Sequence, residues 1–455
     1  MDFSLLESFI FEKMSKTHLP GLSIAIVKNG EVIYSRGFCF RDLEYGLRAT
    51  PNTLYGIGSI TKSFTALSIM QLAEKGKLGL EDYVSKYIPL NLKSGEEPVK
   101  IWHLLSHTSG IPALAYAEAL IRYLTGVGEK WAPIASCEDI LTFMREANQW
   151  VLAKPGERLF YLNEGYVILG CVIEKLSGMS YEDYVKRNVL EPLEMNRSFF
   201  KWEDVESDLD VATPYIITRD GECKKSVYPY GISADGGLIS NVLDLARYIT
   251  MFLNRGTYKG NTLVSPSFIE EMEKPRINLP LQIFGGESYG YGLSITPNFL
   301  GNKLVSHGGS VLVYTAYMGY IPEKKMGIAL MANGSGYPLS QIGLYGLALM
   351  LNENPENLPF IKIERVYDEL TGLYETYKGT MQAQVVSKGG ILQIEIKDKY
   401  TDMIIPLIPE NIEGSMKKFY AFQSGGKLPV EFIVEGGKVE LIYERYRLKK
   451  VGNLT

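Results

Sequence analysis

The chain has 455 residues, of which 46% are hydrophobic and 22% are charged, and its formal net charge is -5 at pH 7. A chain of this length can form two or three domains, and its acidic balance gives no electrostatic footprint for nucleic acid or for an anionic membrane. No apolar run approaches the roughly 20 residues that a membrane-spanning helix needs. We therefore expect a globular protein that binds neither nucleic acid nor membrane.

The N-terminal residues and the cysteines bear on cellular location. The first seven residues are acidic and lack a basic region followed by an apolar core, so no signal peptide is predicted. Cys39, Cys137, Cys171 and Cys223 are scattered, so we expect neither a zinc site nor a disulfide framework, and we expect Cys39 and Cys171 in the core. These features predict a cytoplasmic protein without a metal or an organic cofactor.

In chain order, the first predicted elements are a short amphipathic helix over 5–14 and two strands over 21–27 and 31–37. Asn29-Gly30 joins the strands. This dipeptide is typical of type I′ turns, which need positive φ at both central residues. An early antiparallel hairpin is therefore expected.

The run Gly56–Lys62 (G-I-G-S-I-T-K) brings Ser59 to the start of an apolar helix that continues to about residue 75. Residues three apart on a helix lie about 5–6 Å apart at Cβ, so Lys62 can reach the serine hydroxyl. A desolvated lysine is one of the few groups able to accept the proton of a nucleophilic serine. Ser59 is therefore predicted to attack a carbonyl. Two further Ser-x-x-Lys runs, at Ser415 and Ser424, lie among strand-like alternation and glycines and are not expected on helices.

The middle of the chain, from residue 78 to about 280, is predicted to be mainly helical, with helices over 101–106, 164–177, 181–190 and 242–254. Strands are then predicted over 305–319 and 325–333, followed by a helix over 341–351. This order predicts an α/β part that carries an all-α insertion between the halves of its sheet, with a cleft between the two.

The C-terminal part has a different pattern. Residues 352–365 begin with a polar, proline-containing stretch and are predicted to be a linker, which leaves 1–351 as the first domain. From 366 to 455, short alternating strands separated by glycine pairs predict a small up-and-down antiparallel barrel. A separate barrel with exposed loops is compatible with a homo-oligomer.

A second candidate site is Tyr161-Leu162-Asn163, in a loop just before a predicted helix. A phenol beside a lysine ammonium can relay a proton to a leaving group, and an asparagine two residues later can hold a substrate amide. The alternative is that Tyr161 packs in the core and that Asn163 caps the helix.

A third candidate site is the run 306–310 (S-H-G-G-S), which is predicted to lead into a strand over 311–317. Paired glycines at the rim of a strand let a substrate backbone approach closely. The alternative is a turn beside an incidental histidine. His107 competes as a general base, but its polar, helix-ending surroundings favour a structural role in fixing a loop, and Ser109 is not expected to be a nucleophile.

Ser59-x-x-Lys62, Tyr161-x-Asn163 and His307-x-Gly309 occur in an order and at spacings that resemble the penicillin-recognising serine hydrolases. The runs 103–110, 191–195 and 234–240 also resemble the branch that holds class C β-lactamases, DD-peptidases, D-aminopeptidases and related esterases. The resemblance covers residue 1 to about 350. It implies a β-lactamase/transpeptidase-like α+β fold, with an antiparallel sheet, flanking helices and an all-α subdomain. The barrel is similar to the lipocalin-like barrels of D-aminopeptidases, as in an archaeal-type serine peptidase.

The resemblance implies acyl transfer to water through an ester of Ser59. Lys62 and Tyr161 would accept the serine proton, and Tyr161 with His307 would protonate the leaving group. Asn163 would orient the substrate amide, and the backbone amides of Ser59 and Ser310 would hold the oxyanion. The implied substrate-binding residues are Asn163, Gly308, Gly309 and Ser310.

Many family members carry Lys-Thr-Gly where this chain has His307-Gly308-Gly309. Lysine offers a permanent cation for the carboxylate of penicillin, whereas histidine offers a charge only weakly at neutral pH. A peptidase acting on small peptides, including those with D-residues, is therefore favoured over a β-lactamase. The alternatives are a carboxylesterase or amidase and, outside the enzymes, a ligand sensor that stays acylated.

Overall fold

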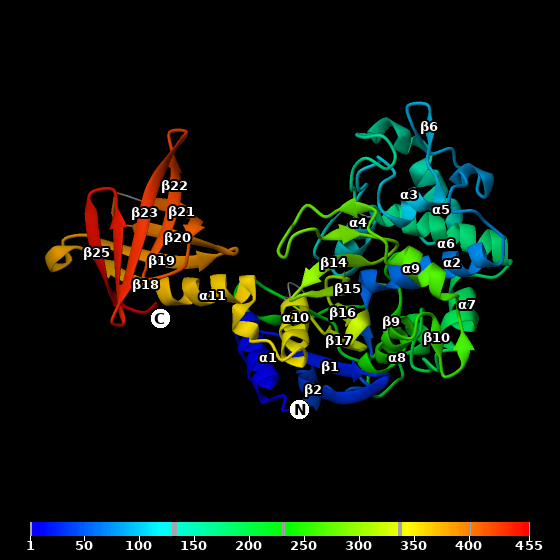
Figure 1. Ribbon diagram of the computed structural model, residues 1–455, viewed down its shortest axis with the longest axis horizontal. Helices are drawn as coiled ribbons and strands as arrows, with labels where there is room; N and C mark the ends of the chain where they lie inside the picture. The colour runs from blue at the N-terminus through cyan, green and yellow to red at the C-terminus, as the bar shows by residue number, and fades with distance from the viewer. Residues whose placement is uncertain are drawn as a thin grey trace. The chain divides into compact units, whose positions relative to one another are not determined.

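The computed structural model describes residues 2–129, 134–229, 231, 233–334, 339–397, 399–400 and 402–454. The chain forms two compact units, Met1–Glu353 and Asn354–Thr455, which Figure 1 colours from blue to yellow and from yellow to red. Within the described ranges, no helix is both long and apolar enough to cross a lipid bilayer.

A nine-stranded antiparallel sheet organises the first unit, in the order β12-β13-β14-β15-β16-β17-β1-β2-β3. Its strands are β1 Gly21–Lys28, β2 Glu31–Asp42, β3 Leu47–Arg48, β12 Ile277–Asn278, β13 Ser288–Tyr289, β14 Ser294–Phe299, β15 Asn302–Ser310, β16 Thr315–Ile321 and β17 Met326–Ala332. Strand β1 lies between β17 and β2, so the N-terminal hairpin pairs with the last strand of the unit. The predicted antiparallel sheet is confirmed.

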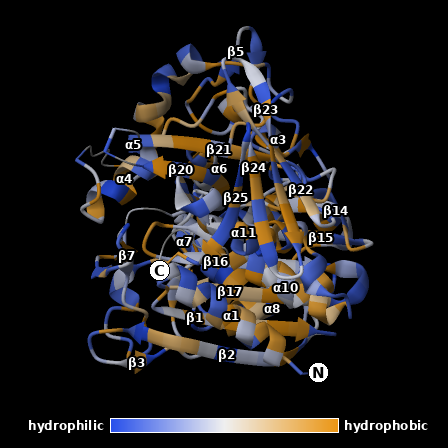
Figure 2. Ribbon diagram, turned by 90° about the vertical axis from the view of Figure 1, so that its left-hand side faces the viewer, coloured by the Kyte–Doolittle hydropathy of each residue, from blue (hydrophilic) through white to orange (hydrophobic). Residues whose placement is uncertain are grey.

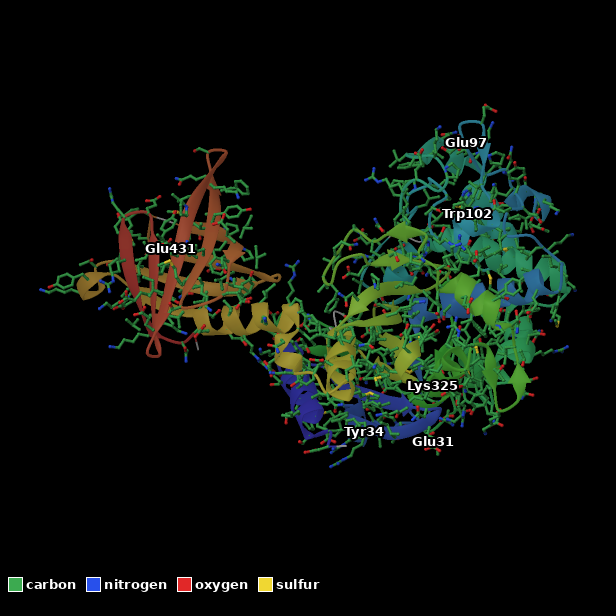
Figure 3. All side chains as sticks on the ribbon, in the orientation of Figure 1. Glu31, Tyr34, Glu97, Trp102, Lys325 and Glu431 are labelled. Atoms are coloured by element: carbon green, nitrogen blue, oxygen red, sulfur yellow. A yellow bond between two sulfur atoms is a disulfide. The ribbon has the colours of Figure 1, made fainter. Side chains whose placement is uncertain are left out.

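The hairpin between β1 and β2 has the predicted turn. Asn29 and Gly30 both adopt positive φ, of 53° and 83°, as a type I′ turn requires. The neighbouring turn before β17 lies at the same end of the sheet, because the Asn29 N–H donates to the Lys325 carbonyl at 2.8 Å. Figure 3 labels Glu31 and Lys325, which mark these two turns.

Helices cover both faces of the sheet, and side-chain alternation along β17 explains how. Leu330 faces Gly343 of α10 (Leu339–Met350), which itself packs on α1 (Ser4–Thr17). Gly327 has the opposite parity and faces Ile249 of α8 (Val242–Leu253). Strands β16 and β17 are therefore buried on both sides, and β17 consists almost entirely of apolar residues, which give it an orange colour in Figure 2.

The insertion between β3 and β12 is mainly helical, as predicted. Besides α8, it contains α2 Thr61–Glu74, α3 Ile101–Leu105, α4 Tyr116–Leu124, α5 Cys137–Phe143, α6 Asn163–Ser177, α7 Tyr181–Val185 and α9 Pro266–Met272. It also holds short strand pairs that were not predicted, β4 Tyr55–Gly56 with β9 Ile239–Ser240, β5 Lys93–Ser94 with β6 Glu97–Pro98, β7 Tyr215–Ile217 with β8 Cys223–Lys225, and β10 Thr257–Tyr258 with β11 Asn261–Thr262. The helix expected over 181–190 is α7 followed by a π-helical turn over Lys186–Leu190.

The strand predicted over 305–319 is two strands, and that prediction was wrong. Strands β15 and β16 are separated by a turn in which the Val311 N–H donates to the Tyr314 carbonyl at 3.0 Å. Leu312 takes positive φ at 69°. Because Val311, Val313 and Tyr314 are all buried, this turn has the apolar composition of a strand.

The structure also differs from what was expected of the cysteines. Cys171 in α6 lies in the core, as expected, but it forms a disulfide with Cys137 at the start of α5, which was not expected. The two positions lie 34 residues apart, too far for local spacing to reveal the pair. Cys39 is an exposed free cysteine on β2 rather than a core residue. Because disulfides are rare in reducing compartments, the cysteines no longer support a cytoplasmic location.

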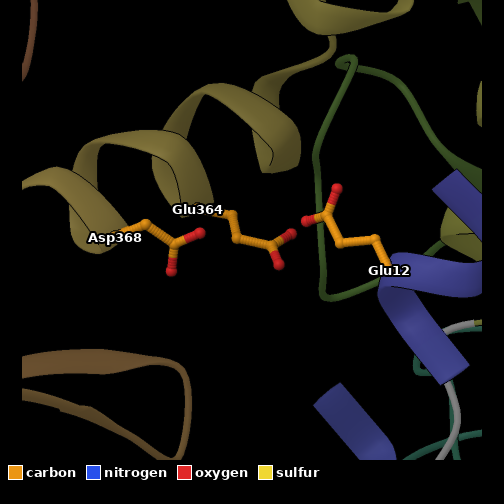
Figure 4. A group of neighbouring side chains, drawn as sticks. All are labelled: Glu12, Glu364 and Asp368. Carbon is orange, nitrogen blue, oxygen red and sulfur yellow. The ribbon is translucent and has the colours of Figure 1, made fainter. Parts of the chain in front are cut away.

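The second unit is a helix followed by a closed barrel. Helix α11, Pro359–Leu370, packs Tyr367 and Leu370 into the barrel core, so residues 359–365 are helical rather than part of a linker without structure. Glu364 and Asp368 lie one turn apart on one face of this helix (Figure 4). The barrel strands are β18 Gly372–Glu375, β19 Gln382–Lys388, β20 Ile391–Lys397, β21 Asp402–Asn411, β22 Met416–Gln423, β23 Gly426–Glu435, β24 Lys438–Tyr443 and β25 Tyr446–Gly452. The predicted barrel is confirmed.

Replacing Cys137 and Cys171 together by alanine is expected to lower the free energy of unfolding by roughly 3–4 kcal/mol, because the bond closes a loop of 34 residues. Denaturant titration measures this change, and Cys39→Ala is the control that should leave the midpoint in place. Thiol titration of the denatured, unreduced protein should find two free thiols. Four reactive thiols would contradict the disulfide.

Candidate active site

Ser59 lies in a tight 3₁₀ turn, Gly58–Ile60, that leads directly into α2. Lys62 is fully buried in the first turn of α2, and its Nζ donates to Ser59 Oγ at 3.0 Å and to the Asp235 carbonyl at 2.7 Å. The predicted serine and lysine are therefore in contact. The other two Ser-x-x-Lys runs lie in strands and turns of the barrel, as expected.

Tyr161 lies in the loop before α6, and its ring faces Lys62. Lys62 Nζ is 4.9 Å from the centre of that ring, and 36% of Tyr161 is exposed. The tyrosine can therefore contact both the buried amine and a bound substrate.

His107 holds the Tyr161 loop. Its carbonyl accepts from the Phe160 N–H at 2.8 Å, its Nδ1 accepts from the Leu162 N–H at 3.0 Å, and its ring lies 4.0 Å from that of Tyr161. Burial, with Lys62 and His307 nearby, holds the pKa of His107 well below its usual value, so the ring is neutral and its proton is on Nε2. These contacts match the structural role expected for His107.

Asn163 begins α6 and lines the same cavity as Ser59 and Tyr161. Its side chain does not cap the helix. Instead, Nδ2 donates to Glu118 Oε1 of α4 at 3.3 Å. The carbonyl oxygen of the Asn163 side chain is then the atom left to accept a hydrogen bond from a substrate N–H.

Strand β15 carries His307, Gly308, Gly309 and Ser310, so this run is part of a strand and does not lead into one. A Cβ at Gly309 would lie 1.9 Å from the Ile57 carbonyl oxygen and 3.1 Å from the Ser59 nitrogen. A Cβ at Gly58 would lie 2.5 Å from the Ser310 nitrogen. Both glycines are therefore needed for the backbones that carry Ser59 and Ser310 to approach each other.

His307 lies in the cavity, but its ring is already committed. Its Nδ1 donates to the Gly308 carbonyl at 2.6 Å, and its Nε2 accepts from the Tyr289 hydroxyl at 2.9 Å. Burial and the nearby Lys62 lower the pKa of His307 to about 4. The expected role of His307 as a proton donor to the leaving group does not match these hydrogen bonds, because the ring has no free proton at neutral pH.

Asp235 is a buried group that sequence reasoning did not assign a role. Its carbonyl holds Lys62, and its side chain, 2% exposed, leaves Oδ1 without a hydrogen-bond partner among the described residues. Burial raises the pKa of this carboxyl, although Lys62 and Tyr116 oppose the rise. The only sequence signal was that Asp235 falls in the run 234–240, which resembles the family.

The site opens into a cavity of about 680 Å³ between the helical part and β15–β16. It brings together every predicted catalytic and binding residue except the buried Lys62, which lies just beneath Ser59. The cavity wall also contains residues that were not predicted, Glu118, Ile121, Arg122, Leu312 and Tyr317. Among the described lining residues, no three potential metal ligands converge on one point.

Comparisons with known proteins identify the family of this chain. The family described as Beta-lactamase matches residues 6–349, and the Pab87 octamerisation domain matches residues 355–449. The chain therefore belongs to the β-lactamase family, a family of serine hydrolases that includes penicillin-binding proteins.

Individual relatives extend the match. A solved structure, the octameric penicillin-binding protein homologue from Pyrococcus abyssi, is 51% identical, covers 99% of this chain and 100% of that one, and superimposes with a TM-score of 0.95. Penicillin-binding protein 4* of Bacillus subtilis is 28% identical over 85% of this chain and 86% of its own length. Protein flp of Staphylococcus aureus is 28% identical over 72% of this chain, which spans 62% of the length of that relative.

The glycines of β15 give a matched test. Gly309→Ala should lower kcat/KM at least about 100-fold, because a methyl group there displaces the turn that carries Ser59 and ångström shifts have effects of this size. Gly308→Ala is the control for the stability of the strand. The nearest atom to a Cβ at Gly308 lies 3.9 Å away, so the unfolding temperature of this variant should not change. Equal activity of wild type and Gly309→Ala would contradict the close approach.

Proposed function

We propose that this protein is a serine peptidase that works through a covalent acyl-enzyme on Ser59. The observation that carries the proposal is the 3.0 Å contact between Lys62 Nζ and Ser59 Oγ at the wall of a cavity large enough for a peptide. A buried amine within hydrogen-bond reach of a hydroxyl is the arrangement that activates a serine in the absence of a histidine base.

In the first step, Ser59 Oγ attacks the substrate carbonyl, and its proton passes to the Lys62–Tyr161 pair. For this step, one member of the pair must be deprotonated, either Lys62 as a neutral amine or Tyr161 as a phenolate, so that it can accept the serine proton. The same proton is then delivered to the leaving nitrogen as the C–N bond breaks. A water molecule then attacks the ester carbonyl of the acyl-enzyme and gives its proton to the same pair. The pair returns a proton to Ser59 Oγ as the ester bond breaks and the acid leaves.

The backbone around Ser59 supports an oxyanion site. Gly58 and Gly309 bring the Ser59 and Ser310 nitrogens to adjacent backbones, where two N–H groups can stabilise the negative charge of the tetrahedral intermediate. On the acyl side, the Asn163 carbonyl oxygen is available to a substrate N–H because its nitrogen is occupied by Glu118.

The preferred substrates are small peptides, including those with D-residues, with esters and simple amides as the alternative. The uncharged His307 supports this choice over penicillin, because a neutral imidazole does not attract a carboxylate. Parallel assays on paired L- and D-peptides and on matched esters distinguish a peptidase from an esterase. Ester hydrolysis without peptide cleavage would refute the peptidase, and a burst without turnover would favour an acylated sensor.

Ser59→Ala is expected to abolish covalent labelling by a fluorophosphonate probe. Tyr161→Phe should lower kcat about 100-fold or more, in the range of a lost proton-transfer group. Ser109→Ala is the matched control, because Ser109 Oγ only accepts from the Ile111 N–H at 3.3 Å. Labelling that persists in Ser59→Ala, or a larger loss in Ser109→Ala, would place the nucleophile elsewhere.

We also propose that the chain forms a homo-oligomer through its barrel unit. The match of residues 355–449 to the Pab87 octamerisation domain and the octameric state of the Pyrococcus abyssi homologue support this. Sedimentation should give a mass well above 51.0 kDa for the full chain and a smaller assembly for a chain ending at Glu353. A truncated chain that keeps the full assembly would contradict the proposal.

A further inference from the structure

Glu164 is a buried carboxyl at the point where helices α4 and α6 both begin, and it is not among the described residues that line the cavity. We propose that Glu164 is a positioning residue that fixes the start of α4 and thereby holds Glu118 against Asn163. This inference rests on the proposed function, in which Asn163 orients the substrate amide. It gives a role to a residue that neither the sequence motifs nor the comparisons identify.

Helix α4 has no capping side chain of its own. The residue before it, Ala115, takes positive φ at 63° and carries no group that accepts a hydrogen bond. The first backbone N–H groups of a helix have no partner within the helix, so the N–H of Tyr116 needs an acceptor from elsewhere. Glu164 Oε1 accepts from this N–H at 3.2 Å. Glu164 therefore caps α4 from a neighbouring helix.

The carboxyl of Glu164 lies at the N-termini of two helices. It belongs to the first turn of α6, is 1% exposed, and its Oε2 has no hydrogen-bond partner among the described residues. The positive end of a helix dipole stabilises a carboxylate, and two such ends meet here. Burial nevertheless raises the pKa of Glu164 to about 7, against the backbone N–H groups of Glu164 itself and of Tyr116. Both protonation states keep an oxygen that can accept from Tyr116, so the contact does not depend on the charge.

The cap fixes the end of α4 from which its cavity-lining residues follow. Tyr116 is buried and packs on Phe143 of α5, with ring centres 6.3 Å apart, and α4 packs on α6 (Figure 1). The residues of α4 that line the cavity come within the next two turns and are Ala117, Glu118, Ile121 and Arg122. A shift of the start of α4 along α6 therefore moves Glu118 relative to Asn163.

Glu118 determines which end of the Asn163 amide faces a substrate. An ionised carboxylate can only accept, so the Asn163 Nδ2 group is the end that turns to Glu118 Oε1, at 3.3 Å. The Asn163 carbonyl oxygen is then left for the cavity. Without Glu118 in place, the amide is free to flip and to present its NH₂ group, which does not accept from a substrate N–H. Glu164 thus acts on the substrate through two other residues and does not touch it.

The test uses two substrates that share a scissile ester and a p-nitrophenyl leaving group. One is the p-nitrophenyl ester of N-acetyl-D-alanine, and in the other an oxygen atom replaces the N–H of the acyl group. Only the first can donate to Asn163, so the ratio of their kcat/KM values, corrected for their uncatalysed hydrolysis rates, measures this hydrogen bond. The wild type should favour the first substrate about 10-fold, the size expected when the loss of one partner leaves an acceptor unpaired.

Glu164→Met has a side chain of similar length without a strong acceptor, so the ratio should fall several-fold. Glu164→Gln keeps an oxygen that accepts from the Tyr116 N–H and should keep the wild-type ratio. Glu174→Met is the matched control. Glu174 also lies on α6 and accepts from the first N–H of a neighbouring helix, that of Tyr181 in α7 at 3.0 Å, but α7 contributes no residue to the described cavity wall. Its ratio should stay as in the wild type, whatever the change in unfolding temperature.

Glu164→Asp is the second variant, should Glu164→Met fail to fold. Its carboxyl is one methylene shorter and no longer reaches the Tyr116 N–H, so the ratio should fall here too. A wild-type ratio in the folded variants that lack the contact would overturn the inference, and so would an equal fall in Glu164→Gln.

Fluorophosphonate labelling of Ser59 separates failure of this inference from failure of the proposed function. A wild type that is labelled but turns over both substrates without preference refutes the positioning of Asn163 and leaves the hydrolase in place. Absent labelling in the wild type refutes the hydrolase itself.

Discussion

The site depends on a single buried amine, that of Lys62, held between the Ser59 hydroxyl and the Asp235 carbonyl. An ammonium or amine inside a protein needs hydrogen-bond partners, because an unsatisfied buried polar group is costly. The run that contains Asp235 is fixed to the start of α2 by polar contacts. Thr65 Oγ1 donates to the Ala234 carbonyl at 2.6 Å, and the Leu238 N–H donates to Thr61 Oγ1 at 3.2 Å. The partners of the lysine are therefore positioned before any substrate binds.

The imidazoles of His107 and His307 lie near this amine, and both are neutral for the same reason. Burial, together with the nearby Lys62, disfavours a positive charge on His107 and on His307. Their hydrogen bonds nevertheless give them different tasks. His107 uses its Nδ1 and its carbonyl to hold the Tyr161 loop, whereas His307 presents an uncharged edge to the cavity. The substitution of lysine by histidine in the third motif thus changes the charge of the site without changing the serine, lysine and tyrosine beside it.

Sequence reasoning found the parts of the site whose signal is local. Ser59 and Lys62 are three residues apart, and Tyr161 and Asn163 are two apart, so spacing alone brings each pair together. Other parts of the site reach it only through tertiary contacts, namely Tyr289, Glu118 and the carbonyl of Asp235. No sequence pattern near these residues predicts such contacts. The roles of His307 and of the disulfide-bonded Cys171 were missed for the same reason, since each depends on a partner at least 18 residues away. The turn after β15 was missed because its residues are buried and apolar like those of a strand.

The place of β1 between β17 and β2 has a consequence for how the chain reaches its active form. Leu22 pairs with Ala332, near opposite ends of the first unit, so the sheet is completed only when the last strand arrives. Pairings between such distant segments form slowly, because a long loop must close before the contact is made. During synthesis, α2 and its Ser59–Lys62 pair leave the ribosome long before β15, which carries the opposite wall of the cavity. Ser59 and Lys62 are therefore made early but meet the backbone of Ser310 late, and a nascent or truncated chain lacking β15–β17 lacks the residues of these strands that line the cavity.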